Sequence, residues 1–341
     1  MRMNAAETTL LTQCQQIIAD SGEIDDPELA AEVLYAALRL VKDSPGRADN
    51  KLVLRTLKEL RYGFKVFRPY QGQRKVSIFG SARTPTTDPD YELAAEFGRR
   101  ISGAGYMVIT GAGGGIMEAG HQGAGQANSF GIAIKLPFEQ ATNSIIAGDE
   151  KLAHFRYFFS RKLMLLKETH AVALFPGGFG THDEAFEVLT LISTGRADPM
   201  PIVLLEHPGG NYWRRWENFI RESLLGNGFI SPEDMTLWTI TTDADEAARH
   251  IAKFYSNYHS MRYHHDDLIL RLAQAPSPEK FRAIQKDFAD LLRPGGEFRL
   301  AGAEAEPSPA PLPEYVRLVF QFNRRVPGKL RQLLDRLNDN E

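Results

Sequence analysis

The sequence predicts an α/β protein whose central part is a parallel β-sheet covered by helices on both faces. Three observations lead to this fold class. Between residues 73 and 256, short apolar runs alternate with segments of helical periodicity, and this alternation is typical of successive β-α-β units. The apolar runs are nearly continuous, as strands buried on both faces of a parallel sheet require. Several of them stop at glycine or proline, which marks the end of a strand.

The predicted elements of this domain follow one another in a regular order. Apolar runs predict strands at 75–79, 106–110, 131–135, 171–175, 201–205 and 237–240. Apolar residues at helical spacing predict helices at 91–101, 116–126, 158–168, 181–193, 213–224 and 243–255. We expect a loop between the third strand and the helix at 158, and right-handed crossovers, which are the default between parallel strands.

The two flanks of this domain have a different pattern. Residues 1–72 carry apolar residues at helical spacing, with a break at Ser44-Pro45-Gly46, and predict a helical appendage or a dimer surface. Residues 257–341 predict a small helical or α+β extension. Within it we expect helices at 260–274, 278–292 and 327–337, a strand at 314–323, and an exposed linker at 302–313 that is rich in Ala, Glu and Pro.

Composition and charge exclude several classes of protein. The 341 residues carry a net charge of −3, whereas general nucleic-acid binders usually present a basic face. Cys14 is the only cysteine, which excludes an internal disulfide and a cysteine-based zinc site and favours a reducing compartment. We find neither the apolar stretch of a signal peptide nor an apolar run of the roughly 20 residues that span a bilayer. We therefore expect a cytoplasmic protein that binds neither nucleic acid nor membrane.

Three segments with glycines or hydroxyl groups follow predicted strands: Gly80-Ser81-Ala82-Arg83, residues 111–115 and residues 176–181. Because ligands of open parallel sheets bind at the carboxyl ends of the strands, we expect the three segments at one edge. The last one, Pro176-Gly177-Gly178-Phe179-Gly180-Thr181, opens a helix. Its glycines allow close approach to a phosphate, and the helix N-terminus offers free N–H groups. The alternative is a turn without a ligand, in which Thr181 caps the helix with Glu184 as its capping-box partner.

Two common nucleotide-binding motifs are absent from the sequence. Residues 111–116 lack the last glycine of G-x-G-x-x-G and follow the second strand instead of the first, and no G-x-x-x-x-G-K-[ST] is present. Glu184 lies one turn into its helix and can face a ligand, whereas Asp183 should point about 100° away. Glu118 lies one turn into the helix after Gly115. We expect no metal, because the following histidines do not have the spacing of metal ligands: His154, His170, His182, His264 and His265.

Four motifs, in the right order, resemble those of the Lonely Guy (LOG) family, whose members were once mislabelled lysine decarboxylases. Residues 176–184 match the signature PGGxGTxxE. Residues 79–83 are similar to the family's first loop, residues 113–119 to its second, and residues 157–162 to its Arg-Lys motif. The likeness covers about 75–255, and it implies a Rossmann-like doubly wound sheet.

This resemblance also implies an activity and a set of site residues. Family members hydrolyse the N-glycosidic bond of a nucleoside 5′-monophosphate and release the free base and ribose 5-phosphate, with AMP and cytokinin riboside monophosphates as substrates. Because the long flanks resemble those of longer bacterial members, AMP or a related monophosphate is favoured. The resemblance implies no cofactor, and it implies a homodimer or a larger homo-oligomer.

The catalytic pair of the family falls on Glu184 and Arg161. A carboxylate can stabilise an oxocarbenium-like state and deprotonate water, while a guanidinium can hold the phosphate or a ribose hydroxyl. The implied substrate-binding residues are Gly80, Ser81, Arg83, Gly113, Gly114, Gly115, Glu118, Lys162, Gly177, Gly178, Gly180 and Thr181.

Two other functions compete with hydrolysis. A non-catalytic nucleotide or cofactor sensor or carrier on the same fold would need the phosphate loop but not the pair Glu184 and Arg161. Lysine decarboxylation would need pyridoxal phosphate on a lysine, and no lysine is placed at the loops for it. His182 stands where family members often carry an apolar residue, so it either contacts the ligand or only covers the site.

Overall fold

The computed structural model describes residues 4–43, 46–135, 141–307 and 311–339. The chain forms two compact units, Met1–Arg61 and Tyr62–Glu341. The break predicted at Ser44-Pro45-Gly46, the loop predicted after residue 135 and the linker predicted at 302–313 each lie partly outside the described residues.

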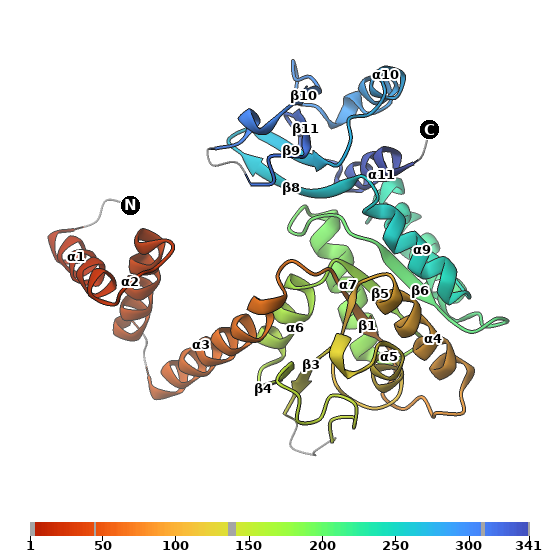
Figure 1. Cartoon of the computed structure of the whole chain (residues 1–341), viewed down its shortest axis with the longest axis horizontal. Coiled ribbons are helices and arrows are strands. Elements are labelled where there is room, and N and C mark those ends of the chain that lie inside the picture. The colour runs from red at the N-terminus through yellow and green to blue at the C-terminus, as the bar shows by residue number, and fades with distance from the viewer. Residues whose placement is uncertain (1–3, 44–45, 136–140, 308–310, 340–341) are drawn as a thin grey trace. The chain divides into compact units, whose positions relative to one another are not determined.

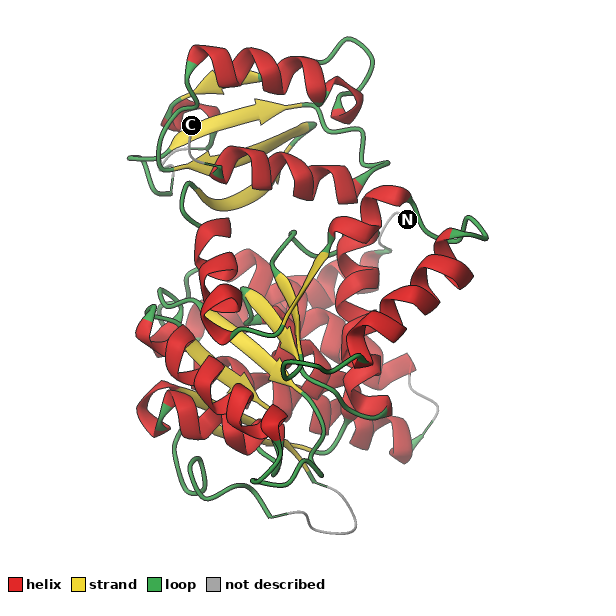
Figure 2. Ribbon diagram, turned by 90° about the vertical axis from the view of Figure 1, so that its right-hand side faces the viewer, coloured by secondary structure: helices red, strands yellow, loops and turns green. Residues whose placement is uncertain are grey.

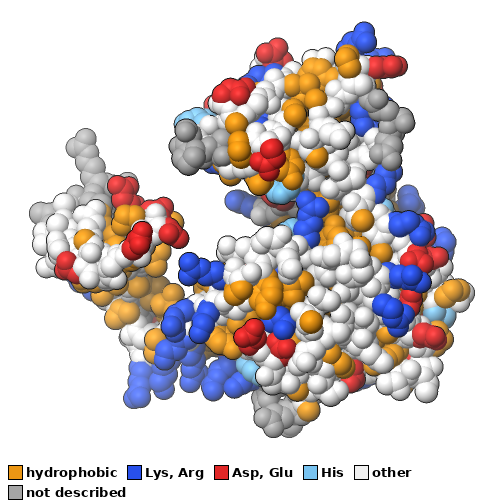
Figure 3. All heavy atoms as spheres, in the orientation of Figure 1, with side chains coloured by type: hydrophobic (Ala, Val, Ile, Leu, Met, Phe, Trp, Pro, Cys, Tyr) orange, Lys and Arg blue, Asp and Glu red, His pale blue; other side chains and the backbone are white. Residues whose placement is uncertain are grey.

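The first unit is helical, as predicted. α1 (Ala5–Asp20) begins with a capping box in which the Asn4 side chain accepts from the amide of Glu7 and the Glu7 carboxylate accepts from the amide of Asn4, both at 2.9 Å. α2 (Pro27–Asp43) packs against α1, and α3 (Arg47–Phe67) begins in this unit and ends in the second. Leu29 and Val33 of α2 are 57% and 58% exposed, so hydrophobic side chains remain at the surface of this unit (Figure 3).

A seven-stranded parallel sheet forms the centre of the second unit (Figure 1). Its strands are β1 (Lys75–Phe79), β2 (Met107–Thr110), β3 (Ser129–Ile134), β4 (Leu152–Phe155), β5 (Ala171–Leu174), β6 (Ile202–Leu205) and β7 (Trp238–Thr241). Across the sheet they follow the order β4-β3-β2-β1-β5-β6-β7. The chain therefore adds strands on one side of β1 as far as β4 and then continues on the other side with β5. The predicted Rossmann-like doubly wound sheet is confirmed.

Helices cover both faces of this sheet (Figure 2). They are α4 (Pro89–Gly103), α5 (Ile116–Ala124), α6 (Phe158–Lys167), α7 (Phe179–Ser193), α8 (Tyr212–Phe219) and α9 (Ala244–Phe254). A π-helical turn at Ile220–Leu225 continues α8, and 3₁₀ turns lie at Arg68–Tyr70, Gln126–Asn128, Pro232–Thr236, Ala289–Leu291 and Ala303–Ala305. Because helices pack on both sides, the strands are nearly all buried; β1, for example, buries all five of its residues.

The edge strand β4 is missed by the sequence prediction. It has only four residues, and His154 within it is exposed, so no continuous apolar run marks it. Its place is set by pairing with β3, from Gly131 opposite Leu152 to Ile134 opposite Phe155. Such pairing is a tertiary contact that hydrophobic periodicity does not reveal.

The C-terminal part adds a second sheet, which is antiparallel and ordered β10-β11-β9-β8. Its elements are β8 (Tyr258–His264), β9 (Asp267–Leu272), α10 (Pro278–Asp287), β10 (Arg299–Ala301), β11 (Val316–Phe320) and α11 (Pro327–Asn338). The helix predicted at 260–274 is wrong, because β8 and β9 form a hairpin that turns at His265, whose φ is +53°. Leu268, Leu270 and Leu272 all enter one core with α11, and a spacing of two is the strand period.

The expectation of an exposed linker at 302–313 is wrong at Glu306, whose side chain is fully buried. Its carboxylate accepts hydrogen bonds from Arg271 of β9 and Arg317 of β11, with the Nε atom of each 2.9 Å from Oε1. These guanidinium groups, Arg271 first, lower the pKa of Glu306 to about 2. Glu306 therefore ties its segment to the second sheet.

None of the helices in the described ranges is long and apolar enough to cross a membrane. The longest, α3, has 21 residues, but its sequence RADNKLVLRTLKELRYGFKVF carries charges along its whole length.

Candidate functional site

The three predicted loops meet at the centre of the carboxyl edge of the sheet. β1 and β5 are neighbours there, at the point where the strand order reverses, and β2 lies on the other side of β1. The amide of Ser81, after β1, donates to the carbonyl of Pro176, after β5, at 3.1 Å. The Ser81 carbonyl in turn accepts from the amide of Ile116, at the start of α5 after β2, also at 3.1 Å. A reversal point of this kind is where open α/β sheets bind ligands.

Two glycines allow these loops to come so close together. Gly115 has φ +61°, and a Cβ atom on it would lie 2.3 Å from the carbonyl oxygen of Ser81. A Cβ atom on Gly177 would lie 2.1 Å from Oγ1 of Thr181. Gly178 and Gly180 differ, because a Cβ atom on either would meet no atom within 4 Å. Gly115 and Gly177 therefore hold the loops together, while Gly178 and Gly180 border open space.

The capping-box alternative for Thr181 and Glu184 is wrong. α7 begins at Phe179, two residues earlier than predicted, with Gly178 as its N-cap and no capping side chain. Thr181 is therefore the third residue of the helix, and the first amides of α7 have no acceptor within the helix. Neither side chain is occupied in capping, so both are available to a ligand.

Glu184 is a buried carboxylate with an unsatisfied oxygen. Its residue is 6% exposed, and Oε2 has no hydrogen-bond partner among the described residues. Burial raises the pKa of Glu184 to about 7, although the nearby charges of Lys162 and Arg161 oppose the rise. The carboxyl group can therefore gain and lose a proton near neutral pH, as a general base requires.

Arg161 of α6 faces the same space as Glu184. Its Nε donates to the carbonyl of Ile132 in β3 at 2.9 Å, which fixes the guanidinium. The group lies so close to Gly111 that a Cβ atom there would be 2.3 Å from Nη2. Burial lowers the pKa of Arg161, and Glu184 partly offsets this effect. The guanidinium of Arg161 on α6 and the carboxylate of Glu184 on α7 thus border the same cavity, which is described next.

A cavity of about 670 Å³ lies where these groups converge. Eight of the predicted site residues line it: Gly80, Ser81, Arg83, Arg161, Gly178, Gly180, Thr181 and Glu184. Seven further residues also line it: Phe79, Ala82, Gly111, Met117, Phe158, Phe179 and Asp183. Asp183 was expected to point away, yet it borders the cavity. All three phenylalanines among these residues lie inside the recognised motifs, but nothing in their spacing indicates that they face a ligand.

The other predicted residues adjoin the loops but are not among those that line the cavity. Gly115 and Gly177 hold the loops together, and the carbonyl of Gly113 accepts from Nδ2 of Asn143 at 2.9 Å. A Cβ atom on Gly114 would lie 3.8 Å from Oε2 of Glu118, so that carboxylate adjoins the second loop. The ammonium group of Lys162 pairs with Asp183 at 2.9 Å and also with Glu187.

His182 contacts an aromatic cluster and does not line the cavity. Its Nε2 lies 2.7 Å from the hydroxyl of Tyr212, and that hydroxyl donates to the carbonyl of Gly177 at 2.6 Å. The two rings are stacked with centroids 5.8 Å apart. Burial lowers the pKa of His182. The sequence left open whether His182 contacts the ligand or only covers the site; it does not line the cavity, and it contacts the glycine loop through Tyr212, a role that neither possibility included.

The part of the chain that the structure describes contains no group of three or more His, Cys, Asp or Glu side chains that could hold a metal ion. The cavity is instead lined by a carboxylate, a guanidinium, hydroxyl groups and a glycine-rich helix N-terminus. The fold and this cavity define a Rossmann-like α/β protein with a site suited to a phosphorylated small molecule.

Comparison with known proteins finds similarity to one family and to one of its characterised members. Residues 115–251 match the family described as "Possible lysine decarboxylase". A cytokinin riboside 5′-monophosphate phosphoribohydrolase of Mycobacterium tuberculosis is 29% identical over 185 residues, which cover 52% of this chain and 93% of that protein. Over these residues the chain is similar to the LOG family.

Solved structures with lower similarity match about half of the chain. A structural-genomics target is 24% identical, with a TM-score of 0.40, over 53% of this chain and 99% of that one. The molybdenum cofactor carrier protein of Chlamydomonas reinhardtii is 19% identical, with a TM-score of 0.37, over 53% of this chain and 97% of that one.

Proposed function

We propose that this protein hydrolyses the N-glycosidic bond of a nucleoside 5′-monophosphate to the free base and ribose 5-phosphate. The observation that carries the proposal is the carboxylate of Glu184, which is buried, has an unsatisfied oxygen and borders the same cavity as Arg161. A site that only bound a phosphate would not need a carboxylate there, because burying one without a partner costs free energy.

The phosphate is bound at the start of α7. The helix N-terminus provides free amides and the positive end of the helix dipole, and Gly178 and Gly180 leave room for the phosphate oxygens. The hydroxyl of Thr181 and the side chains of Ser81 and Arg83 complete this subsite. Arg161 binds the phosphate or a ribose hydroxyl and so fixes the sugar relative to Glu184.

Glu184 acts as the general base. It takes a proton from a water molecule whose oxygen attacks C1′ of the ribose, while the bond from C1′ to the base nitrogen breaks and the base leaves with the bonding electron pair. Its negative charge also stabilises the oxocarbenium-like state at C1′. Lys162 does not line the cavity. Its charge lowers the pKa of Glu184 and so favours the ionised form.

The second loop serves the ribose. Glu118, held beside Gly114 and the other glycines of this loop, accepts hydrogen bonds from ribose hydroxyls. The name of the Mycobacterium tuberculosis relative supports a riboside 5′-monophosphate as substrate. We propose AMP or a related monophosphate as the preferred substrate, in a cytoplasmic setting.

We also propose that the chain works as a homodimer or a larger homo-oligomer. Phe179, at the mouth of the cavity, is 97% exposed, and Phe158 is 56% exposed. Burying a phenylalanine side chain stabilises a protein by about 1.5–3 kcal/mol, and this free energy is not gained while the two side chains are exposed to water. A second copy of the chain that covers them would recover this free energy and narrow the entrance to the cavity.

The test is a base-release assay with a panel of nucleoside 5′-monophosphates, combined with calorimetric binding of AMP. Wild type should release free base, and Glu184→Gln should bind AMP while releasing base about 10²- to 10⁴-fold more slowly. Glu92→Gln, at an exposed glutamate on α4, is the matched control and should keep the full rate. Binding without release by wild type would make the protein a nucleotide carrier or sensor, and release by Glu184→Gln at the full rate would refute the mechanism.

A further inference from the structure

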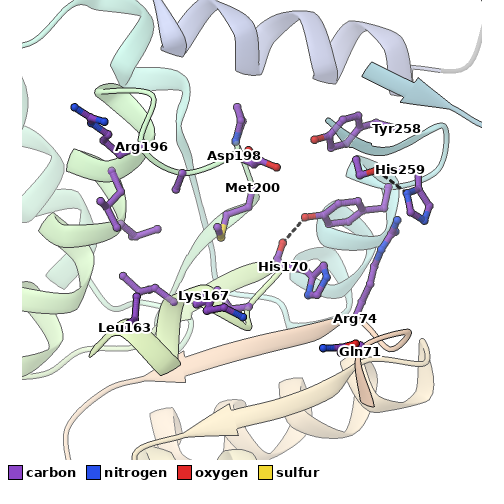
Figure 4. Close-up of a pocket in the computed structure, with 18 of the residues that line it drawn as sticks. Gln71, Arg74, Leu163, Lys167, His170, Arg196, Asp198, Met200, Tyr258 and His259 are labelled. Carbon is purple, nitrogen blue, oxygen red and sulfur yellow. Dashed lines mark hydrogen bonds between the residues drawn. The ribbon is translucent and has the colours of Figure 1, made fainter. Parts of the chain in front are cut away.

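A second cavity, of about 1090 Å³, lies at the opposite edge of the sheet (Figure 4). Arg74, His170 and Met200, which line it, come just before β1, β5 and β6. Tyr255 and Tyr258, at the start of the C-terminal part, form its other side. A cavity of this size holds a small organic molecule. The proposed hydrolysis makes no use of it.

Much of the wall of this cavity is apolar or aromatic. Leu163 and Leu166 of α6, Val188 of α7 and Met200 face it. The rings of Tyr255 and Tyr258 are nearly parallel, at 22°, with centroids 6.1 Å apart. His170 adds no charge near neutral pH, because burial and neighbouring cations lower its pKa to about 4. A flat, apolar molecule suits such a wall.

Asp198 is the exception on this wall. In Figure 4 its carboxylate points into the cavity on the side of Tyr258. It makes no hydrogen bond or ion pair with any residue in the described ranges. The carboxylate is open to the water of the cavity, yet the surrounding protein raises its pKa to about 6 through burial alone. A carboxylate on an apolar wall offers two acceptor oxygens to a ligand that supplies hydrogen-bond donors.

Three of the four cations on the same wall, Lys162, Lys167 and Arg74, already have partners. Lys162 pairs with Asp183 and Glu187, and Lys167 pairs with Glu168 at 2.7 Å. The guanidinium of Arg74 lies over the ring of Tyr255, 3.8 Å from its centroid. Arg196 points away from Asp198 in Figure 4. The group that points into the cavity beside the tyrosines is thus the Asp198 carboxylate, an acceptor, which favours a ligand with donors there over an anionic one.

We propose that this cavity is a second ligand site, which binds a planar amino-substituted heterocycle. The ring lies among Tyr258, Met200 and the leucines of α6, and adjacent N–H groups donate to the two oxygens of Asp198. A carboxylate accepts two such bonds side by side, and charge-assisted hydrogen bonds of this kind are about twice as strong as neutral ones.

The second site shares two walls with the candidate active site. α6 carries Arg161 to the active site and Leu163 to the second cavity, while α7 carries Glu184 to the first and Val188 to the second. Lys162 lines the second cavity and pairs with Asp183, which lines the first. A ligand in the second cavity therefore changes the rate of base release. This last step rests on the proposed function, whereas the binding does not.

The binding test uses two probes of the same size on the full chain at pH 8. 2-Aminobenzimidazole presents adjacent N–H groups, and 2-methylbenzimidazole has a methyl group in place of the amine. By isothermal titration calorimetry we expect one site per chain for the first probe and at least tenfold weaker binding of the second. Asp198→Asn should weaken the binding of the first probe at least tenfold. It should fold normally because Asp198 has no partner to lose.

Three further variants locate the binding. Glu184→Gln changes the carboxylate of the candidate active site and should leave the affinity unchanged. Leu163→Trp puts a larger side chain where the ring would lie and should weaken binding, while Leu300→Trp, at an exposed leucine of β10, should have no effect. Thermal melts of every variant show that each is folded. The site is refuted if the two probes bind equally, if Asp198→Asn binds as wild type does, or if Glu184→Gln abolishes binding.

The coupling between the two sites has a separate test. With AMP as substrate, saturating 2-aminobenzimidazole should change the rate of base release by wild type at least twofold and leave that of Asp198→Asn unchanged. An unchanged wild-type rate would refute the coupling but not the site. If wild type releases no base at all, the hydrolase proposal fails while the calorimetry still decides the second site.

Discussion

Replacing Glu184 with glutamine should stabilise the folded chain, and the gain should grow as the pH rises. Burial raises the pKa of Glu184 to about 7 in the folded chain, from an ordinary value of 4.5. Below pH 4.5 the carboxyl is protonated in both folded and unfolded chains, and the substitution changes little. Above about pH 7 the folded chain must hold an ionised, buried carboxylate, whereas glutamine stays neutral.

The size of the effect follows from the two pKa values. They differ by about 2.5, and each pKa unit corresponds to about 1.4 kcal/mol, so the wild type loses about 3 kcal/mol of stability between low and high pH. Part of this loss is already present at pH 5. Between pH 5 and pH 8 the advantage of Glu184→Gln should therefore grow by about 2.5 kcal/mol.

Guanidinium unfolding at pH 5 and pH 8, followed by tryptophan fluorescence, measures this difference. All three tryptophans lie in the second unit, and Trp216 packs against Phe186 of α7, so the signal reports the unit that contains Glu184. Glu92→Gln should give the same stability difference from wild type at both pH values. An advantage of Glu184→Gln that is equal at pH 5 and pH 8 would refute the view that burial destabilises the ionised carboxylate.

Four further predictions concern Gly177 in the glycine loop, the ionisation of Glu184, the exposed Phe179 and the buried Glu306. Gly177→Ala should slow base release tenfold to a hundredfold, because its Cβ would lie 2.1 Å from Oγ1 of Thr181 and displace the loop; an unchanged rate would contradict that crowding. The rate of base release should rise with pH through about 7, as Glu184 ionises, and a rate that falls over this range would assign it the role of an acid. Phe179→Ser should weaken self-association in sedimentation velocity, and wild-type behaviour would place the interface elsewhere. Glu306→Gln should lower the free energy of unfolding by about 3–5 kcal/mol, because it leaves two buried guanidinium groups without their counter-charge; a loss below 1 kcal/mol would contradict this.

The candidate site could be predicted from sequence because a simple rule connects pattern and place. Apolar runs locate parallel strands, the carboxyl ends of such strands share one edge, and the glycine loops follow three of them. This rule does not predict the direction in which each side chain points. It missed that Phe158 and Phe179 line the cavity, that Asp183 borders it and that Lys162 does not, because these depend on how α6 and α7 are rotated against the sheet.

The failures of the fold prediction have a common physical cause. β4 has only four residues and pairs with a strand about twenty residues earlier in the sequence, and β8 and β9 depend on a tight turn at His265; neither kind of contact is visible in hydrophobic periodicity. Leu268, Leu270 and Leu272 did carry the strand period, but the apolar residues around them also fit a helix. Glu306 appeared to lie in a linker because its two arginine partners are 35 and 11 residues away in the sequence.

The order of the strands has a consequence for how the protein is made. During synthesis β1 to β4 leave the ribosome first, and β1 then exposes the edge to which β5 later adds, where Val76 pairs with Ala171. That edge stays open while more than ninety residues are translated, at 5–20 residues each second. An unpaired apolar edge invites association with other chains, so the nascent protein needs several seconds of shielding until β5 arrives. The last strand to pair with β1 thus closes a route to aggregation and creates the ligand-binding crevice in the same event.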